Sequence, residues 1–258
     1  METIQFENNQ GIGILRFARE KVLNALNQQL LVEATTLLEK LKNDEQLRVL
    51  VLTGSGTKAF VAGADIGELR EAGPESGRQL AAQGQHFMDL LDQFPTPVIA
   101  AINGFALGGG LEVALACDFR YAASNAKLGL PEVSLGLIPG YGGTQRLFRL
   151  VGEGVAKEMI FTGEMMSAGE AHDIGLVNKV VEPDQLMDEV MRVASLISKR
   201  GPLAVKAAKR AINVGRNLDL SSGLFTEASE FGTVCTSNDM KEGTSAFLEK
   251  RAPSFDGR

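Results

Sequence analysis

The first third of the chain pairs short apolar strands with one amphipathic helix. Residues 3–17 predict two strands joined by a turn at Gln10-Gly11, because apolar positions nearly alternate in the second one. A helix is predicted over residues 30–41, where apolar residues recur at i, i+1, i+4, i+7, i+8 and i+11. The uninterrupted apolar run 49–52 then predicts a strand that is buried on both faces, as strands of parallel sheets are.

The same alternation continues in the middle of the chain. A polar helical stretch is predicted over residues 75–94, and a second buried strand follows at residues 97–102. The order strand, helix, strand, loop, helix, strand predicts an α/β fold with parallel neighbouring strands. No repeat of fixed length is visible in the sequence.

The last third is mostly helical. The elements predicted there are helices at residues 155–161, 186–197, 204–214 and 240–250, and a short strand at residues 176–181. Pro183 stands where the first turn of a helix accepts proline. The apolar stripes of these helices indicate core packing, and we expect this region to pack against a partner subunit instead of the first domain.

Composition and charge narrow the class of protein. Of the 258 residues, 44% are apolar and 22% are charged, which excludes disorder, collagen and coiled coil. The net charge of −6 argues against a dedicated nucleic-acid binder. Cys117 and Cys235 lie far apart without CxxC spacing, which predicts a reduced, cytoplasmic protein without a zinc site or other metal site. We expect no secretory signal and no membrane span, since no apolar run reaches about 18 residues.

Several well-known catalytic signatures are missing. The chain has no GxSxG, no GxxxxGK[ST] and no GxGxxG, so a serine hydrolase, a P-loop enzyme and a dinucleotide-binding fold are not supported. His86 and His172 are isolated, and each is expected at a surface or a helix end.

Two glycine-rich segments remain. One is residues 62–65, and the other is residues 103–112, where Gly108, Gly109 and Gly110 stand between a predicted buried strand and an apolar stretch. A helix start presents free backbone N–H groups and favours negative charge. One glycine would suffice for a tight turn with positive φ, so three in succession predict that something approaches the backbone closely.

Two glutamates stand in apolar surroundings. Glu112 follows the three glycines, and Glu132 lies within the apolar residues 128–133. Burial raises the pKa of a carboxyl group, and two such groups can divide acid and base roles on one water molecule. The structural alternative is that Glu112 stabilises the helix start and Glu132 forms a salt bridge.

These segments, with others, resemble the crotonase (enoyl-CoA hydratase/isomerase) superfamily. The matching segments are residues 59–65, 103–112, 116–118, 131–132, 136–147 and 175–178. The resemblance runs the length of the chain and implies an α/β, crotonase-like spiral of ββα repeats with a C-terminal helical trimerisation region. It implies a core with the active site at residues 1–195 and a helical region for oligomer contacts at residues 196–258. A homotrimer or a dimer of trimers, a homohexamer, is therefore expected.

The resemblance also implies an acyl-CoA thioester substrate and no separate cofactor. The N–H groups of Ala64 and Gly109 would form an oxyanion hole around the thioester oxygen, and Gly140 would help to order the site. The presence of both glutamates favours an enoyl-CoA hydratase, which adds water in syn fashion to a trans-2-enoyl-CoA in fatty-acid β-oxidation. In this reaction, which gives an (S)-3-hydroxyacyl-CoA, Glu112 would activate the water, and Glu132 would hold the same water and deliver a proton to C2.

CoA contacts are carried over from the same resemblance. The expected contacts are backbone groups of Ala62, Ala64, Asp65 and Ile66 along the pantetheine and adenine, Lys21 and Lys58 near the phosphates, and Lys250 near the adenine nucleotide, from a neighbouring subunit. Tyr141 stands where a small residue is also familiar in the family, and residues 68–83 carry no motif, so acyl-chain length stays open.

Alternative functions also stay open. A Δ3,Δ2-enoyl-CoA isomerase or a specialised acyl-CoA dehydratase would use the same scaffold. An RNA-binding member would need a basic helix, for which residues 199–210 are the candidate. A non-catalytic acyl-CoA-binding scaffold would not need both glutamates.

Overall fold

The strands form two sheets in the computed structural model, which describes residues 1–258. The six-stranded sheet has the order β1 (Ile4–Asn9), β2 (Ile12–Phe17), β3 (Val49–Gly54), β5 (Val98–Ile102), β7 (Phe119–Ala123), β10 (Lys179–Val181). The four-stranded sheet has the order β4 (Ala59–Val61), β6 (Phe105–Leu107), β8 (Lys127–Gly129), β9 (Met166–Ser167). The pairs β1–β2 and β8–β9 are antiparallel, and all other pairs are parallel.

From β3 to β8, successive strands alternate between the two sheets, and helical segments follow each pair. After β3 and β4 come α2 (Ile66–Arg70) and α3 (Pro74–Asp92), after β5 and β6 comes α4 (Gly109–Ala116), and after β7 and β8 come η2 (Pro131–Leu135), α5 (Gly143–Val151) and α6 (Glu153–Thr162). The remaining helices are η1 (Glu20–Val22), α1 (Gln28–Leu41), α7 (Ala168–Asp173), η3 (Pro183–Gln185), α8 (Leu186–Ser198), α9 (Pro202–Gly215), α10 (Leu220–Val234) and α11 (Asn238–Leu248). The repeated ββα unit is thus present. It leaves no fixed period in the sequence because its connecting helices differ greatly in length.

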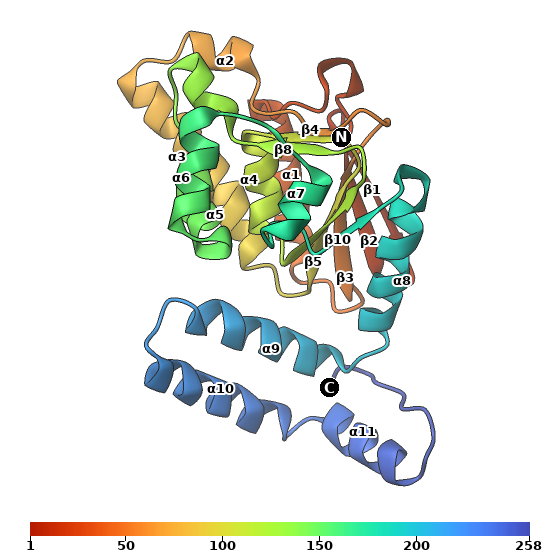
Figure 1. The fold of residues 1–258 in the computed structure, drawn as a ribbon. Helices are drawn as coiled ribbons and strands as arrows, with labels where there is room; N and C mark the ends of the chain where they lie inside the picture. The colour runs from red at the N-terminus through yellow and green to blue at the C-terminus, as the bar shows by residue number, and fades with distance from the viewer.

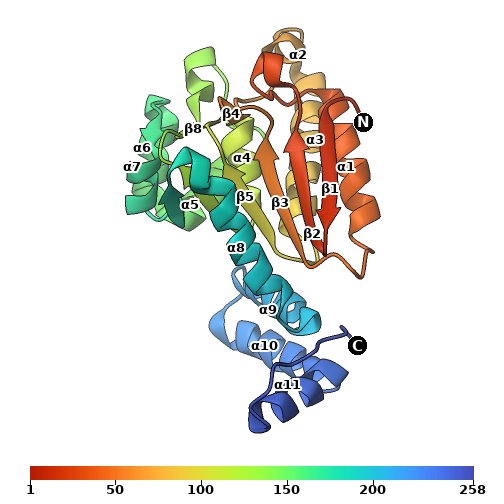
Figure 2. The ribbon, with the colours of Figure 1, turned by 90° about the vertical axis from the view of Figure 1, so that its right-hand side faces the viewer.

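The central strands β3 and β5 of the larger sheet are buried on both faces. On β3, Leu50 and Leu52 belong to the main core, which α1 and α3 cover, whereas Val49 and Val51 pack against α8. Figure 2 shows α8 in front of this sheet and α1 and α3 on its other side. Side chains alternate along a strand, so a strand covered on both faces is apolar throughout, which is what the run 49–52 predicted.

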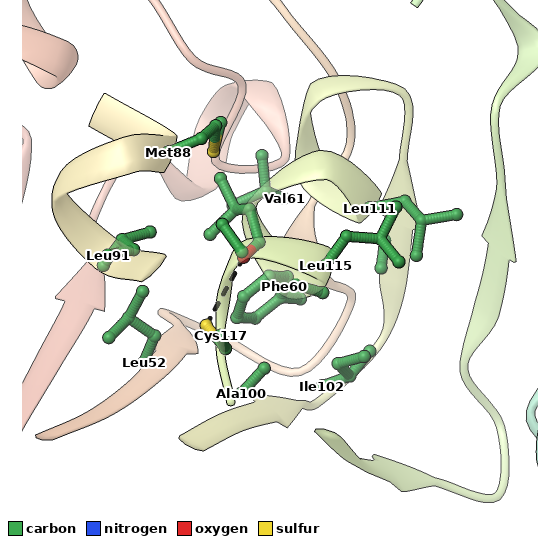
Figure 3. Close-up of a cluster of buried hydrophobic side chains, with 14 of the residues drawn as sticks. Leu52, Phe60, Val61, Met88, Leu91, Ala100, Ile102, Leu111, Leu115 and Cys117 are labelled. Carbon is green, nitrogen blue, oxygen red and sulfur yellow. Dashed lines mark hydrogen bonds between the residues drawn. The ribbon is translucent and has the colours of Figure 1, made fainter. Parts of the chain in front are cut away.

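The main core continues between the two sheets. Phe60 of β4 is fully buried and lies among Leu52, Met88 and Leu111 (Figure 3). Cys117 closes the same cluster, and burial raises the pKa of its thiol to about 12. Both cysteines are free, so this thiol acts as a small apolar core group.

The C-terminal third divides between the core and a separate layer. The helix α8 packs on the larger sheet, so the expectation that this third packs on a partner instead of the first domain is wrong for α8. The helices α9, α10 and α11 lie apart from the sheets (Figure 1). The division into residues 1–195 and 196–258 stays a prediction; α8 ends at Ser198 and α9 begins at Pro202. None of the helices is both long and apolar enough to cross a membrane.

Candidate active site

The candidate site lies where the parallel strands of the smaller sheet end. Ala64, Gly109 and Glu132 follow β4, β6 and β8, respectively, within three residues. Parallel strands place their carboxyl ends at one edge, where α/β proteins commonly bind ligands. The backbone packing there is close: a Cβ atom added to Gly108 would lie 3.7 Å from the Cα of Gly63 and 2.9 Å from Oε1 of Glu132. The structure therefore brings the two glycine-rich segments and Glu132 together.

Two backbone N–H groups at this edge are available to a ligand. Leu26 donates its N–H to the Gly63 carbonyl at 2.9 Å and accepts from the Asp65 N–H at 2.7 Å. Because N–H groups alternate along extended backbone, the Ala64 N–H points away from Leu26, and no acceptor in the chain receives it. Gly109 is the first residue of α4, where an N–H has no acceptor within the helix and the helix dipole favours an anion.

The three successive glycines serve different purposes. Gly108 has a φ of +51°, a conformation that favours glycine. A Cβ atom on Gly110 would lie 1.9 Å from the Val61 carbonyl oxygen, so this glycine lets α4 pack against β4. The close approach predicted from the sequence is thus partly internal, and Gly109 is the member whose N–H is available to a ligand.

Glu112 is held by a loop that is distant in sequence. Its side chain lies in α4, and the residue is only 2% exposed. Oε1 accepts hydrogen bonds from the N–H groups of Tyr141 at 2.8 Å and Gly143 at 2.6 Å. Burial raises the pKa of Glu112 to about 7; the charge of Glu132 adds to this, and the two N–H donors oppose it. Since its donors are Tyr141 and Gly143, Glu112 does not cap its own helix by a hydrogen bond, although it lies in the first turn of α4, where the helix dipole favours a carboxylate.

Glu132 offers a different environment. It lies half-buried in η2, and its Oε2 is buried without any hydrogen-bond partner. No lysine, arginine or histidine forms an ion pair with it, so the predicted salt-bridge alternative is wrong. Burial raises its pKa. A buried carboxyl oxygen without a partner is costly in a folded protein and is typical of a functional site.

Gly140 links the loop that holds Glu112 to α3, because its carbonyl oxygen accepts a hydrogen bond from Nε2 of Gln85 at 2.9 Å. Gly140 forms no hydrogen bond with Glu112 or Glu132. Anchoring of Glu112 by Tyr141 and Gly143 was not predicted from the sequence. The available signal was the glycine-rich run around Tyr141, because a backbone N–H reaches a buried carboxylate most easily where side chains are small: a Cβ atom on Gly143 would lie 2.9 Å from Oε1 of Glu112.

The expected CoA contacts of the β4–α2 segment lie beside the two available N–H groups. Ile66 begins α2 and is 52% exposed, and Ala62 is half-buried. The Asp65 carboxylate is occupied within the chain, because it accepts from the Gly67 N–H at 3.1 Å and pairs with Arg19 at 2.9 Å. The backbone of Asp65 is engaged as well, because its N–H donates to the Leu26 carbonyl and its carbonyl accepts from the N–H groups of Glu68 and Leu69.

The expected lysines fall into two places. Lys21 and Lys58 are both exposed. Their segments are neighbours, because a Cβ atom on Gly56, two residues before Lys58, would lie 2.3 Å from Oε1 of Glu20, the residue before Lys21. Lys250 follows α11, in the helical layer that lies across the molecule from β4 and β8 (Figure 1). One chain therefore does not bring Lys250 to the site.

Other candidate groups do not join the site. His86 and His172 are both exposed, as expected. In the basic stretch 199–210, Lys209 pairs with Asp118 and Arg210 pairs with Glu230, so these cations are engaged within the chain. No group of three or more His, Cys, Asp or Glu side chains could hold a metal ion.

A cleft of about 920 Å³ lies elsewhere, between α9 and the core. Its walls include Arg146, Lys209 and Arg216, and each of these forms an ion pair with an aspartate. Neither of the two glutamates lines it, and neither Ala64 nor Gly109 does, so it is separate from the candidate site.

Known proteins share this sequence and fold. The sequence model of the Enoyl-CoA hydratase/isomerase family matches residues 7–258. A crotonyl-CoA hydratase of Syntrophomonas wolfei is 47% identical over 254 residues, 98% of each chain. A short-chain-enoyl-CoA hydratase of Clostridium acetobutylicum is 45% identical over 251 residues, 97% of this chain and 96% of that one. The crystal structure of an enoyl-CoA hydratase from Bacillus anthracis matches with a TM-score of 0.97 and 44% identity, over 99% of this chain and 100% of that chain.

The chain therefore belongs to the enoyl-CoA hydratase/isomerase family. The family and the crotonase-like fold predicted from the sequence are both confirmed.

Proposed function

We propose that the protein is a hydro-lyase that adds water in syn fashion to a trans-2-enoyl-CoA and yields an (S)-3-hydroxyacyl-CoA in fatty-acid β-oxidation. The carrying observation is that two glutamates with raised pKa values lie beside two available backbone N–H groups. The names of the two relatives, a crotonyl-CoA hydratase and a short-chain-enoyl-CoA hydratase, support a short acyl chain as the substrate.

The N–H groups of Ala64 and Gly109 bind the thioester carbonyl oxygen in this proposal. As water adds to C3, electron density moves through C2 onto that oxygen, and the acyl group gains enolate character. Preorganised donors stabilise such charge, and each is worth about 3–4 kcal/mol in the transition state. The dipole of α4 adds to the effect at Gly109.

The two glutamates divide the proton transfers. Glu112 as a carboxylate takes a proton from the water whose oxygen bonds to C3, while Glu132 in its acid form gives a proton to C2. One water molecule is thereby added, and the cycle closes when the proton on Glu112 returns to Glu132 through solvent exchange. All atoms of the product come from the water and the thioester, which are both substrates, so the proposal needs no cofactor.

The proposal extends to binding and assembly. The proposed CoA contacts are the backbone of Ala62, Ala64, Asp65 and Ile66, the ammonium groups of Lys21 and Lys58, and Lys250 of a second copy. We propose a homotrimer or a dimer of trimers, because a single chain leaves Lys250 far from its own site. Two free cysteines fit a cytoplasmic location.

The test is hydration of crotonyl-CoA, followed as loss of the conjugated enoyl-thioester absorbance, beside longer 2-enoyl-CoAs and a 3-enoyl-CoA. Glu112→Gln and Glu132→Gln should each lower kcat by about 10²–10⁴-fold, because each removes one proton-transfer group, with nearly unchanged CoA affinity. Glu158→Gln, on the exposed surface of α6, is the matched control and should keep the wild-type rate.

Two results would contradict the proposal. Conversion of the 3-enoyl-CoA without hydration of any 2-enoyl-CoA would indicate an isomerase. A near wild-type rate in either glutamine variant would disprove the two-glutamate mechanism.

A further inference from the structure

The ring of Tyr141 is packed between two glycines of different helices. A Cβ atom on Gly84 of α3 would lie 2.1 Å from Cδ1 of Tyr141 and 2.4 Å from both Cγ and Cε1. On the other edge of the ring, a Cβ atom on Gly109 would lie 3.3 Å from Cδ2. Tyr141 is only 8% exposed, so the ring has little room to move.

Local backbone structure gives no reason for glycine at position 84. Gly84 is buried inside α3 with ordinary helical geometry, and glycine within a helix costs about 1 kcal/mol relative to alanine. The reason is space: the ring occupies the volume that a β-carbon would need.

The packing of the ring is coupled to the catalytic carboxyl group. The Tyr141 N–H donates to Oε1 of Glu112 at 2.8 Å. Cγ is only two bonds from the Cα of Tyr141, so displacing it requires a turn about χ1 or a shift of the backbone that carries this N–H. A turn away from Gly84 would press the ring toward Gly109, whose N–H is a proposed oxyanion donor.

An adjacent face of α3 holds the loop at two further points. Gln85 donates from Nε2 to the Gly140 carbonyl at 2.9 Å, and Asp89 pairs with Arg146 at 2.7 Å. Arg146 in turn donates to the Tyr141 carbonyl at 3.3 Å. Positions 85 and 89 are one helical turn apart and lie on one face, so α3 acts as a rigid support for residues 140–146.

We propose that Gly84 is a positioning residue for the hydration reaction: the absence of its side chain seats the Tyr141 ring, and the ring fixes the N–H that orients Glu112. This inference rests on the proposed function. Gly84 itself touches neither substrate nor reacting atoms in this proposal.

The test compares Gly84→Ala with Gly77→Ala. Both glycines lie in α3, and a Cβ atom on Gly77 would meet nothing within 4 Å, so both variants gain the same helix propensity but only one displaces the ring. Gly84→Ala should lower kcat by roughly 10- to 100-fold with a smaller change in KM, because a small misplacement of a catalytic group has effects of this size. Gly77→Ala should keep the wild-type kinetics.

The pH profile separates positioning from general damage. A weaker Tyr141 N–H bond stabilises the Glu112 carboxylate less, so the acidic limb of the kcat profile should move to higher pH in Gly84→Ala. The charged and titratable groups that face Glu112 are Glu132 from η2, Arg146 from α5 and the Tyr141 phenol, and the variant leaves all three in place.

Removing the Tyr141 ring tests whether its clash with the new β-carbon causes the loss of kcat in Gly84→Ala. Tyr141→Ala eliminates the clash, so adding Gly84→Ala to Tyr141→Ala should cause no further loss of kcat. A further loss equal to that of Gly84→Ala alone, or equal kinetics of Gly84→Ala and Gly77→Ala, would overturn the inference.

A measurement that does not depend on turnover distinguishes failure of this inference from failure of the proposed function. The chain has two tyrosines and no tryptophan, so fluorotyrosine labelling gives two resonances, assigned with Tyr121→Phe. Gly84→Ala should shift the Tyr141 resonance and Gly77→Ala should not; an unmoved resonance in Gly84→Ala refutes the positioning role. A wild-type protein without hydratase activity would refute the proposed function alone, since the resonance does not depend on catalysis.

Discussion

At Glu112 the requirements of folding and of chemistry oppose each other. The carboxyl group is buried, and its pKa is raised to about 7 in the folded protein, against an ordinary value of 4.5. Between these two pH values the folded state keeps a proton that the unfolded chain releases. The free energy of unfolding therefore falls as pH rises through this range, and the carboxylate that would take a proton from water is present at a cost in stability.

The change Glu112→Gln should remove this pH dependence. The variant should gain stability over the wild type as pH rises from 4.5 to 7, by up to about 3 kcal/mol, since one pKa unit corresponds to about 1.4 kcal/mol. The gain should be nearly absent at pH 4.5. Urea denaturation at matched protein concentration, at pH 5 and pH 8, measures the difference. An equal offset between variant and wild type at both values would show that Glu112 is not the titrating group.

Some residues of the candidate site could be predicted from the sequence, and others could not. Glu112 and Glu132 could be identified because carboxyl groups are rare in apolar segments. The N–H donors of Tyr141 and Gly143 could not, because they reach Glu112 from 29 and 31 residues away and any residue carries a backbone N–H. Gly84 gave no sequence signal at all, since its role depends on a ring brought to it by the fold.

At the level of elements, one buried ion pair holds α9 to the core. Nζ of Lys209 lies 2.7 Å from Oδ2 of Asp118 and donates to the Thr96 carbonyl at 3.1 Å. Asp118 also accepts from the Val98 N–H at 2.6 Å, so the pair ties α9 to the beginning of β5. Burial raises the pKa of Asp118, and the neighbouring charge of Lys209 opposes that rise.

The change Lys209→Met should destabilise the protein by about 3 kcal/mol, because it leaves Asp118 buried without a cation. Adding Asp118→Asn should recover part of that loss, since the double variant leaves no unpaired charge. Urea denaturation of both variants and the wild type at one protein concentration provides the comparison. If the double variant were less stable than Lys209→Met, the loss would come from packing and not from charge.

Elements were predictable where one strong pattern dominated. The helix α1 has a complete apolar stripe, and β3 is buried on both faces. The helix α10 was missed because it contains five serine or threonine residues and has no buried residue in this chain, so its apolar positions form no stripe toward a core. Predicted strand 176–181 was too long, because only residues 179–181 pair with β7.

The whole molecule carries an apolar surface that one chain leaves uncovered. On α10, Leu220, Phe225 and Phe231 are 79%, 77% and 72% exposed, and Phe247 of α11 is 83% exposed. Helices owe most of their stability to apolar packing, and monomers rarely expose patches of this kind. The cleft beside α9 also contains the exposed Ile212. These observations support the proposal that other copies of the chain cover the helical layer.

The double change Phe225→Ser with Phe231→Ser should therefore break the assembly. Its mass in light scattering should fall toward 27.6 kDa, the mass of one chain, because the apolar contacts that join copies are lost. Val32→Ser, which alters a 58% exposed apolar residue on α1, should leave the mass of the wild-type assembly unchanged. A wild-type protein that already runs as one chain would contradict the proposed trimer.

The winding of the chain has a consequence for how such a protein can diversify. Each turn of the spiral contributes one strand end to the site: β4 brings Ala64, β6 brings Gly109 and β8 brings Glu132. The groups proposed to hold an anion and the group proposed to supply a proton are thus encoded in different stretches of the gene. Exchange of the stretch after β8 would alter the proposed acid while both proposed anion-binding groups stay on their own turns, so new chemistry could be tried on a thioester that remains bound.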